Sequence, residues 1–410
     1  MSEPDPPVRR IALPELLRRG APAAVLAALP GARAVGGAVR DALAGRPIQD
    51  VDIAVPLSPE AVAERLRAAG LRVFETGLAH GTVTAVLDHA PVEVTSLRRD
   101  VVTDGRHAEV AWTTDWREDA ARRDFTINAM SLDATGGLHD YFGGEADLAA
   151  GRVRFVGDPA TRLAEDYLRA LRFFRFQARY GRGAPDPASV AAIRGAVPGL
   201  TRLSAERVWS ELKRLLVAPD PVPALALMAE TGVLGAVLPE AVPPALTGFT
   251  RALASGLPAD PLLRLAILLD PGTAGQGAAI AERLRFSTEE RERLVRLHDA
   301  AGAAPSDEDP AARRRWLAEH GRAAALDEAW LAEARGAGDL ASLRAWVEAT
   351  PVPEFPLQGR DALALGLVPG PEIGRLLAAA RARWLAEGCV ADRATCLAWL
   401  AELARGGASC

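Results

Sequence analysis

The sequence predicts an α+β protein in which strands and helices alternate in a first part and an all-helical remainder follows. Up to about residue 150, short β-type runs are separated by helical patterns. From Asp158 onward, helical periodicity dominates, and Pro/Gly-rich breaks separate the segments. Strands followed by a run of helices are typical of α+β folds.

The expected elements of the first part are four strands and two helices. We expect the strands at residues 34–36, 51–55, 83–87 and 92–95, and the helices at residues 39–44 and 59–69. The chain of 410 residues is long enough for roughly two to four domains. We divide the chain into three parts, residues 1–150, 151–220 and 221–410.

The charge changes sign along the chain, although the net formal charge is only −5. Residues 51–150 carry 9 basic and 17 acidic side chains, whereas residues 151–214 carry 13 basic and 6 acidic ones. An acidic region next to a basic one suits a carboxylate site for metal ions beside a surface for phosphates.

Cysteine usage and hydropathy predict a cytoplasmic protein without a membrane span. Cys389, Cys396 and Cys410 are an odd number near one end, which fits a reducing compartment. The most apolar stretch, residues 21–39, is interrupted by Pro30 and by glycines. The six histidines show no metal-type spacing, so we expect no transition-metal site.

Two glycines and an arginine indicate a phosphate-binding turn. Gly36 and Gly37 end an expected strand and open an expected helix, so backbone N–H groups can approach an anion without a Cβ in the way. Arg40 follows about one turn later and can add a guanidinium. Together they predict a cradle for a triphosphate.

Two aspartates in the next expected strand indicate a metal site. Asp50 and Asp52 are two residues apart, so both carboxylates leave the same face of a strand. Carboxylate oxygens are the ligands that hard divalent cations such as Mg²⁺ prefer. Two such ions can activate an attacking hydroxyl and stabilise a leaving phosphate.

The run from Gly36 to Ile53 resembles the signature of the polymerase-β-like superfamily, specifically the class II tRNA nucleotidyltransferase and bacterial poly(A) polymerase family. Residues 122–130, 140–148, 165–169 and 204–213 resemble its later motifs in the same order. The resemblance covers roughly the first half of the chain. It implies a nucleotidyltransferase catalytic head at 1–150, a helical neck with the nucleotide-selecting motif at 151–220, and a helical, tRNA-binding body and tail at 221–410.

The resemblance also implies roles for single residues. In the second motif, Arg122, Arg123, Asp124 and Asn128 would hold the sugar and phosphates of the nucleotide. In the fourth, Asp166 and Arg169 would select the base, and Arg172 and Arg175 continue the nucleotide-binding set at three-residue steps along an expected helix.

Hydrogen-bond chemistry gives the selecting pair a physical rationale. A carboxylate only accepts hydrogen bonds and a guanidinium only donates them. Cytosine and adenine both present an amino donor beside a ring-nitrogen acceptor, whereas guanine and uracil present a carbonyl acceptor beside an N–H donor. Asp166 and Arg169 on one helix would therefore accept C and A and leave unpaired groups against G and U.

Two further features concern the switch from adding C to adding A and the number of metal-binding carboxylates. Residues 95–110 resemble the flexible loop that complete CCA-adding members of the family carry between their first two motifs, although an ordinary surface loop would look similar. Glu93, on an expected strand just before this loop, is a candidate third carboxylate near the metals or a solvated strand residue.

We therefore expect a CCA tRNA nucleotidyltransferase that uses CTP and ATP with two Mg²⁺ ions. It would transfer nucleotides to tRNA without a template, release pyrophosphate, and require no membrane and no protein partner. Alternatives are a poly(A) polymerase, a partial enzyme that adds only CC or A, and, more remotely, a catalytically silent RNA-binding protein.

Overall fold

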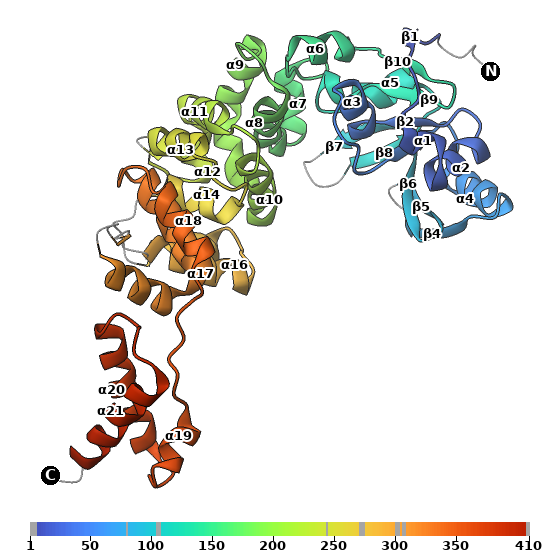
Figure 1. Ribbon diagram of the computed structural model, residues 1–410. Helices are drawn as coiled ribbons and strands as arrows, with labels where there is room; N and C mark the ends of the chain where they lie inside the picture. The colour runs from blue at the N-terminus through green and yellow to red at the C-terminus, as the bar shows by residue number, and fades with distance from the viewer. Residues whose placement is uncertain are drawn as a thin grey trace. The chain divides into compact units, whose positions relative to one another are not determined.

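The computed structural model describes residues 6–78, 81–103, 108–242, 245–269, 275–299, 304–305 and 309–406. The chain divides into two compact units, residues 1–239 and 240–410. The strands and the candidate site residues all lie in the first unit, and the second unit is helical (Figure 1). No helix among these residues is long and apolar enough to cross a membrane.

An eight-stranded sheet forms the first part of this unit. Its strand order is β1-β10-β9-β2-β3-β6-β5-β4, and β3 and β6 are its parallel neighbours. The bounds are Arg9–Arg10 (β1), Arg33–Val35 (β2), Asp52–Val55 (β3), Arg72–Gly77 (β4), Thr82–Leu87 (β5), Ala90–Ser96 (β6), Ser131–Asp133 (β9) and Gly137–His139 (β10). All four strands predicted from the sequence are present, but the sequence pattern missed the short β1, β9 and β10 and the polar β4.

Short helices flank the sheet. They are α1 (Glu15–Arg18), α2 (Gly20–Ala28), α3 (Gly37–Leu43), α4 (Pro59–Ala68), α5 (Trp116–Ala121) and α6 (Gly144–Ala150). The α2 and α4 helices pack on strands β5 and β6. The predicted helices at 39–44 and 59–69 correspond to α3 and α4, and Ser58 caps α4 by accepting a hydrogen bond from Ala61 N–H.

The segment predicted as a mobile loop at 95–110 is mostly a β-ribbon. Residues Arg98–Thr103 (β7) pair antiparallel with Ala108–Trp112 (β8), and the tip at 104–107 lies outside the described residues. The resemblance of this segment to the flexible loop of the family stays a prediction, because the pairing of β7 with β8 does not decide whether the ribbon moves.

Helices complete the first unit. They are α7 (Pro159–Glu165), α8 (Leu168–Tyr180), α9 (Pro187–Ala196), α10 (Ala205–Leu216), α11 (Val222–Glu230) and α12 (Val233–Val237). Helix α8 contacts both α10 and α11, and α12 packs on the 3₁₀ turn Val197–Arg202. This packing continues the first unit to Pro239, beyond the predicted boundary at residue 220.

A phenylalanine cluster fixes α8 against the segment that follows α5. The Phe125 ring is fully buried, with ring centroids 4.9 Å from Phe155 and 5.2 Å from Phe176. Phe173 stacks on Phe155 at 6.0 Å. Because Phe173 and Phe176 belong to α8, burial of these rings holds the polar face of α8 beside residues 122–128.

The second unit consists of nine helices within its described residues. They are α13 (Ala245–Ala254), α14 (Pro261–Leu268), α15 (Gln276–Arg283), α16 (Thr288–Asp299), α17 (Pro310–Ala334), α18 (Ala341–Ala349), α19 (Gly359–Ala364), α20 (Pro371–Ala386) and α21 (Arg393–Gly406). One core cluster gathers around Trp316 and Leu343, and another around Trp384 and Leu400. Gly321 interrupts α17 with a φ of 74° that favours glycine.

Candidate active site

A polar cavity of about 450 Å³ opens in the first unit, where the sheet, α3, α8 and α10 come together. The residues that line it come from five separate stretches of the chain. They are Gly36, Gly37, Arg40, Asp52, Arg123, Asp124, Asn128, Asp166, Arg169, Arg172, Arg175, Phe176 and Arg214. Most of the sequence-predicted site residues are therefore brought together, and Asp50, Glu93 and Arg122 are not among the lining residues.

The glycine turn enters the cavity at the start of α3. Gly36 has a φ of 64°, which glycine adopts at no steric cost. A Cβ at this position would lie 3.1 Å from Arg123 Nη1 and would crowd the cavity wall. Arg40 points back toward this turn and donates a hydrogen bond from Nη1 to Asn128 Oδ1 over 2.6 Å. The turn and the guanidinium thus line the same cavity.

Arg40 is held in place by two residues that the sequence reasoning did not single out. Its Nη2 lies 3.0 Å from Asp41 Oδ2, and its guanidinium lies 4.5 Å from the centre of the Tyr180 ring. Tyr180 in turn donates a hydrogen bond to Asp41 Oδ1 over 2.5 Å. The sequence places Asp41 beside Arg40, but no local pattern predicts that Tyr180, at the end of α8, reaches them.

The two predicted metal ligands lie at the beginning of β3. The strand starts at Asp52, so Asp50 precedes it instead of belonging to it as predicted. Asp50 and Asp52 are exposed, whereas Val51 and Ile53 are buried, which is the alternation expected when positions 50 and 52 face the same side. Partial removal of the Asp52 carboxyl from water at the cavity wall raises its pKa above the ordinary value, Arg123 opposes this, and the charge of Asp50 raises it further.

This donor set fits a divalent cation. The charge of Asp50 contributes to the raised pKa of Asp52, and a cation bound by both carboxylates would relieve this repulsion. Glu93 of β6 is the direct neighbour of Asp52 in the parallel pair, yet it is exposed and does not line the cavity. Across the described chain no group of three or more acidic, His or Cys side chains forms a metal site, so a third ligand stays a prediction.

The second motif contributes a buried carboxylate network. Asp124 accepts hydrogen bonds from Phe125 N–H at 2.8 Å and Asn128 Nδ2 at 3.0 Å, and Arg172 Nη2 lies 2.6 Å from its other oxygen. Burial alone would raise the pKa of Asp124, but the Arg172 guanidinium and these hydrogen bonds hold it below its ordinary value. The carboxylate is therefore ionised and orients Asn128 and Arg172 at the cavity wall.

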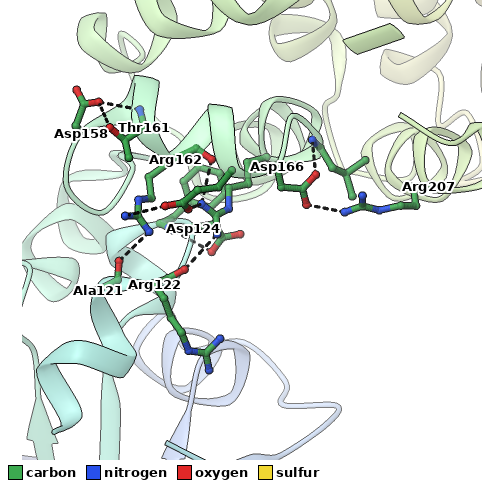
Figure 2. A network of polar contacts seen from close by, with 12 residues as sticks. Ala121, Arg122, Asp124, Asp158, Thr161, Arg162, Asp166 and Arg207 are labelled. Carbon is green, nitrogen blue, oxygen red and sulfur yellow. Dashed lines mark hydrogen bonds and ion pairs between the residues drawn. The ribbon is translucent and has the colours of Figure 1, made fainter. Parts of the chain in front are cut away.

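Arg122 and Arg123 take different directions. Both contact Asp119, Arg122 Nη2 at 2.8 Å and Arg123 Nη2 at 3.3 Å, but only Arg123 lines the cavity. Figure 2 shows the Arg122 guanidinium pointing away from the carbonyl that its backbone offers to Arg169 Nη2 at 3.2 Å. The structure therefore places the side chain of Arg122 outside the cavity.

Asp166 lies in a break between two helices and not on one helix with Arg169 as predicted. Its backbone is extended, with φ −156° and ψ 108°, after α7 ends at Glu165. Its Oδ1 accepts from Leu168 N–H at 3.1 Å at the start of α8. The helix assignment failed because an aspartate can satisfy the first free N–H groups of a new helix better than it can continue the old one.

Asp166 and Arg169 both line the cavity, and each is held by a different partner. Arg207 of α10 donates from Nη2 to Asp166 Oδ2 at 2.6 Å (Figure 2). Arg169 pairs with Glu165 and donates from Nη1 to the Arg162 carbonyl at 3.0 Å. The two groups are thus anchored from behind and remain available at the cavity surface.

One face of α10 supplies residues for which the sequence analysis assigned no role. Arg207, Glu211 and Arg214 are spaced i, i+4, i+7, the period of a single helix face. Arg207 holds Asp166, and Glu211 Oε2 accepts from Arg175 Nε at 2.6 Å. This spacing of charges was visible in the sequence, but their partners on α8 were not.

Comparison with known proteins indicates the family of this chain. Residues 32–154 match the family model described as the poly A polymerase head domain, and residues 184–243 match the one described as the probable RNA and SrmB-binding site of polymerase A. The chain is 38% identical over 394 residues to the mitochondrial CCA tRNA nucleotidyltransferase 1 of Danio rerio, covering 86% of this chain and 83% of the relative.

The chain belongs to the CCA tRNA nucleotidyltransferase family. The mouse member, also described as mitochondrial, is 38% identical over 378 residues, with 87% of this chain and 83% of the relative covered. The crystal structure of the Bacillus stearothermophilus CCA-adding enzyme in complex with CTP is 27% identical, with a TM-score of 0.77 over 97% of this chain and 99% of that one. The Thermotoga maritima CCA-adding enzyme, at 20% identity and a TM-score of 0.67 over 97% of each chain, shares the fold. The family membership and the predicted α+β fold are thus confirmed.

Proposed function

We propose that the protein adds C, C and A in turn to the 3′ end of tRNA, using CTP and ATP without a nucleic-acid template. The observation that carries this proposal is one cavity lined by the glycine turn, Asp52, and both Asp166 and Arg169. A phosphate cradle, a metal-binding carboxylate and a base-reading pair are the parts that nucleotide transfer needs. Relatives that match over most of their length carry this activity in their names.

Base selection rests on Asp166 and Arg169. The Asp166 carboxylate accepts from the amino group of cytosine or adenine, and the Arg169 guanidinium donates to the neighbouring ring nitrogen. Anchoring by Arg207 and Glu165 keeps both side chains oriented before the nucleotide arrives. Because G and U present donors and acceptors in the reverse order, they leave buried groups unpaired and are rejected.

The phosphates of the nucleotide bind to a second set of cavity residues, separate from the pair that selects the base. Gly36 and Gly37 offer backbone N–H groups, and Arg40, Arg123 and Arg172 offer guanidinium groups at the cavity wall. Asn128 and Asp124 hold Arg40 and Arg172 in position. Arg122 and Arg175 complete the proposed nucleotide-binding set, Arg122 through its backbone carbonyl to Arg169.

Asp50 and Asp52 are the proposed ligands of two Mg²⁺ ions, with Glu93 as a candidate third carboxylate. Bound Mg²⁺ supplies activation of the terminal ribose hydroxyl and charge neutralisation on the phosphates. The chain's own contribution is to place the triphosphate between these carboxylates and the arginines, so that the hydroxyl attacks the α-phosphorus and pyrophosphate leaves in line.

A poly(A) polymerase remains the second candidate function because the head matches the poly A polymerase head model. Adenine would satisfy Asp166 and Arg169 as well as cytosine does. The cytoplasm is the proposed location, and the free cysteines Cys389 and Cys396 support it, although the vertebrate relatives are described as mitochondrial. Cell fractionation of the tagged full chain tests the location.

One incubation series distinguishes the candidate activities. The full chain receives Mg²⁺ and a tRNA that lacks its last three nucleotides, together with CTP, ATP, UTP or GTP, singly and combined. Sequencing of the product ends is expected to show CC with CTP alone and CCA with CTP and ATP. Long A tails with ATP alone indicate a poly(A) polymerase, additions that stop at CC or at A indicate a partial enzyme, and no incorporation overturns the proposal.

A further inference from the structure

The six arginines that line the cavity differ in how closely they contact acidic side chains. Five of them have close acidic partners: Arg40 with Asp41 at 3.0 Å, Arg123 with Asp119 at 3.3 Å, Arg169 with Glu165, Arg172 with Asp124 at 2.6 Å and Arg175 with Glu211 at 2.6 Å. Arg214 is the sixth, and its distance to Glu211 Oε1 is 3.8 Å. At that separation no hydrogen bond forms, so Arg214 is the loosest of the six.

Exposure separates Arg214 from the others in the same way. Its side chain is 63% exposed, whereas the exposed fraction of the other five ranges from 10% for Arg40 to 36% for Arg172. Arg214 is nevertheless a lining residue of the cavity. The guanidinium therefore lies at the rim, where it meets both solvent and whatever enters.

Glu211 cannot neutralise both of its arginine neighbours. Its Oε2 accepts the hydrogen bond from Arg175 Nε, and the pairing of the buried Glu211 with the half-buried Arg175 takes up the single negative charge. Burial lowers the pKa of Arg175, and the positive charges of Arg172 and, to a smaller extent, Arg214 lower it as well, against the opposing influence of Glu211. Two guanidinium groups beside one carboxylate leave a net positive charge at this end of the cavity.

We propose that Arg214 binds a substrate phosphate at the rim of the cavity. A guanidinium that is charged, exposed and held at its base by a helix matches the geometry of a phosphate oxygen pair. The phosphate comes either from the incoming nucleoside triphosphate or from the backbone of the RNA 3′ end. This assignment rests on the proposed function, because it presumes that nucleotide and RNA meet in this cavity.

The test compares Arg214→Gln and Arg214→Lys with a matched control, Arg194→Gln. Arg194 on α9 is also an exposed arginine, 49% exposed and paired with Glu230, but it does not line the cavity. Equilibrium titrations of the full chain measure the dissociation constants of CTP and of tRNA lacking its last three nucleotides, each at several salt concentrations. Circular dichroism and Tm check that every variant is folded.

Arg214→Gln is expected to raise the dissociation constant of either CTP or tRNA by about tenfold. This is the effect of losing one charge-assisted hydrogen bond. If the phosphate belongs to RNA, the slope of log Kd against log salt falls by about 0.7 to 0.9 and CTP binding is unchanged. If it belongs to the nucleotide, CTP and ATP both bind more weakly and the tRNA titration is unchanged. Arg214→Lys retains part of the affinity.

The proposal is overturned if Arg214→Gln binds both ligands with dissociation constants within about twofold of those of Arg194→Gln. An exposed charge that contacts no ligand contributes little to binding. A wild-type chain that binds CTP and tRNA but incorporates nothing contradicts the proposed function and leaves the Arg214 titrations interpretable. The two failures are therefore distinguishable.

Discussion

Arg207 Nη2 and Asp166 Oδ2 lie 2.6 Å apart, and this contact joins α10 to the break between α7 and α8. It fixes the position of the Asp166 carboxylate at the cavity wall. Arg207→Gln is therefore expected to lower the preference for C and A over U and G by about tenfold, with a smaller effect on the KM for tRNA. Single-turnover incorporation of each nucleotide measures this preference.

Arg202→Gln is the control, because Arg202 is a nearby arginine outside the cavity lining. An Arg207→Gln variant that loses overall rate but keeps the selectivity of the wild type would show that Arg207 only stabilises the neck.

Arg169 is expected to carry the other half of base discrimination. Arg169→Ala removes the donor for the ring nitrogen, so selectivity should fall by about tenfold or more, because a missing charged donor costs about 1.5 to 3 kcal/mol. The free energy of unfolding should change less, since Glu165 keeps Arg162 as a partner at 3.0 Å. Urea unfolding and competition between CTP and UTP measure the two effects, and unchanged selectivity contradicts the pairing of base and guanidinium.

Asp52→Asn should abolish turnover and stabilise the fold at neutral pH. The pKa of Asp52 is raised above its ordinary value of 3.8, so the folded protein binds this proton more tightly than the unfolded chain does. The ionised carboxylate is thus destabilising above its folded-state pKa, and that penalty disappears as the pH falls through this pKa. We expect a higher Tm at pH 7, and incorporation reduced by roughly a thousandfold or more.

Mg²⁺ provides the control for that experiment. The ion should raise the Tm of the wild type by mass action and have little effect on Asp52→Asn. An Asp52→Asn variant whose Tm at neutral pH is lower than that of the wild type contradicts a destabilising carboxylate at position 52. A Tm that rises with Mg²⁺ as much as that of the wild type contradicts metal binding by this carboxylate.

Asp50→Asn should lower the pKa of Asp52. The charge of Asp50 is one of the causes that raise it, and asparagine removes that charge with little change of shape. Carbon-detected NMR of ¹³C-labelled aspartate follows the titration, and Asp88→Asn, in the exposed turn between β5 and β6, is the control. An Asp52 titration that does not move places the two carboxylates too far apart to share metal ions.

Gly81→Ala should disturb the base of the β7–β8 ribbon. A Cβ on Gly81 would clash with the ring of Trp112, the last residue of β8, at a φ of +77°. If this ribbon takes part in the change from C to A addition, the final A should slow more than the two C additions. Gly70→Ala has a similar φ of +83° but open space around it, so it isolates backbone strain from the clash. Equal slowing of C and A addition would separate the ribbon from nucleotide choice.

Local sequence was sufficient for the strands and helices that carry the glycine turn, Arg40 and Asp52. The alternation around Asp52 and the glycine pair before Arg40 follow from short-range geometry, because a strand exposes every second residue and a sharp turn favours glycine. These patterns placed β2, β3, β5, β6, α3 and α4 correctly. They missed the short β1, β9 and β10, the polar β4 and the β7–β8 ribbon, because these strands are stabilised by pairing with neighbours that local patterns do not record.

The order and chemistry of the motif residues determined the family and the reaction, because a carboxylate, a guanidinium and a glycine turn keep their chemistry wherever the chain folds. Only the tertiary structure decided which of them share one cavity. It separated Arg122 from Arg123, ended α7 before Asp166, and brought Arg207 and Arg214 of α10 to α8. Such contacts join residues some 40 positions apart, and their partners depend on how the buried phenylalanines dock the helices, which no local pattern records.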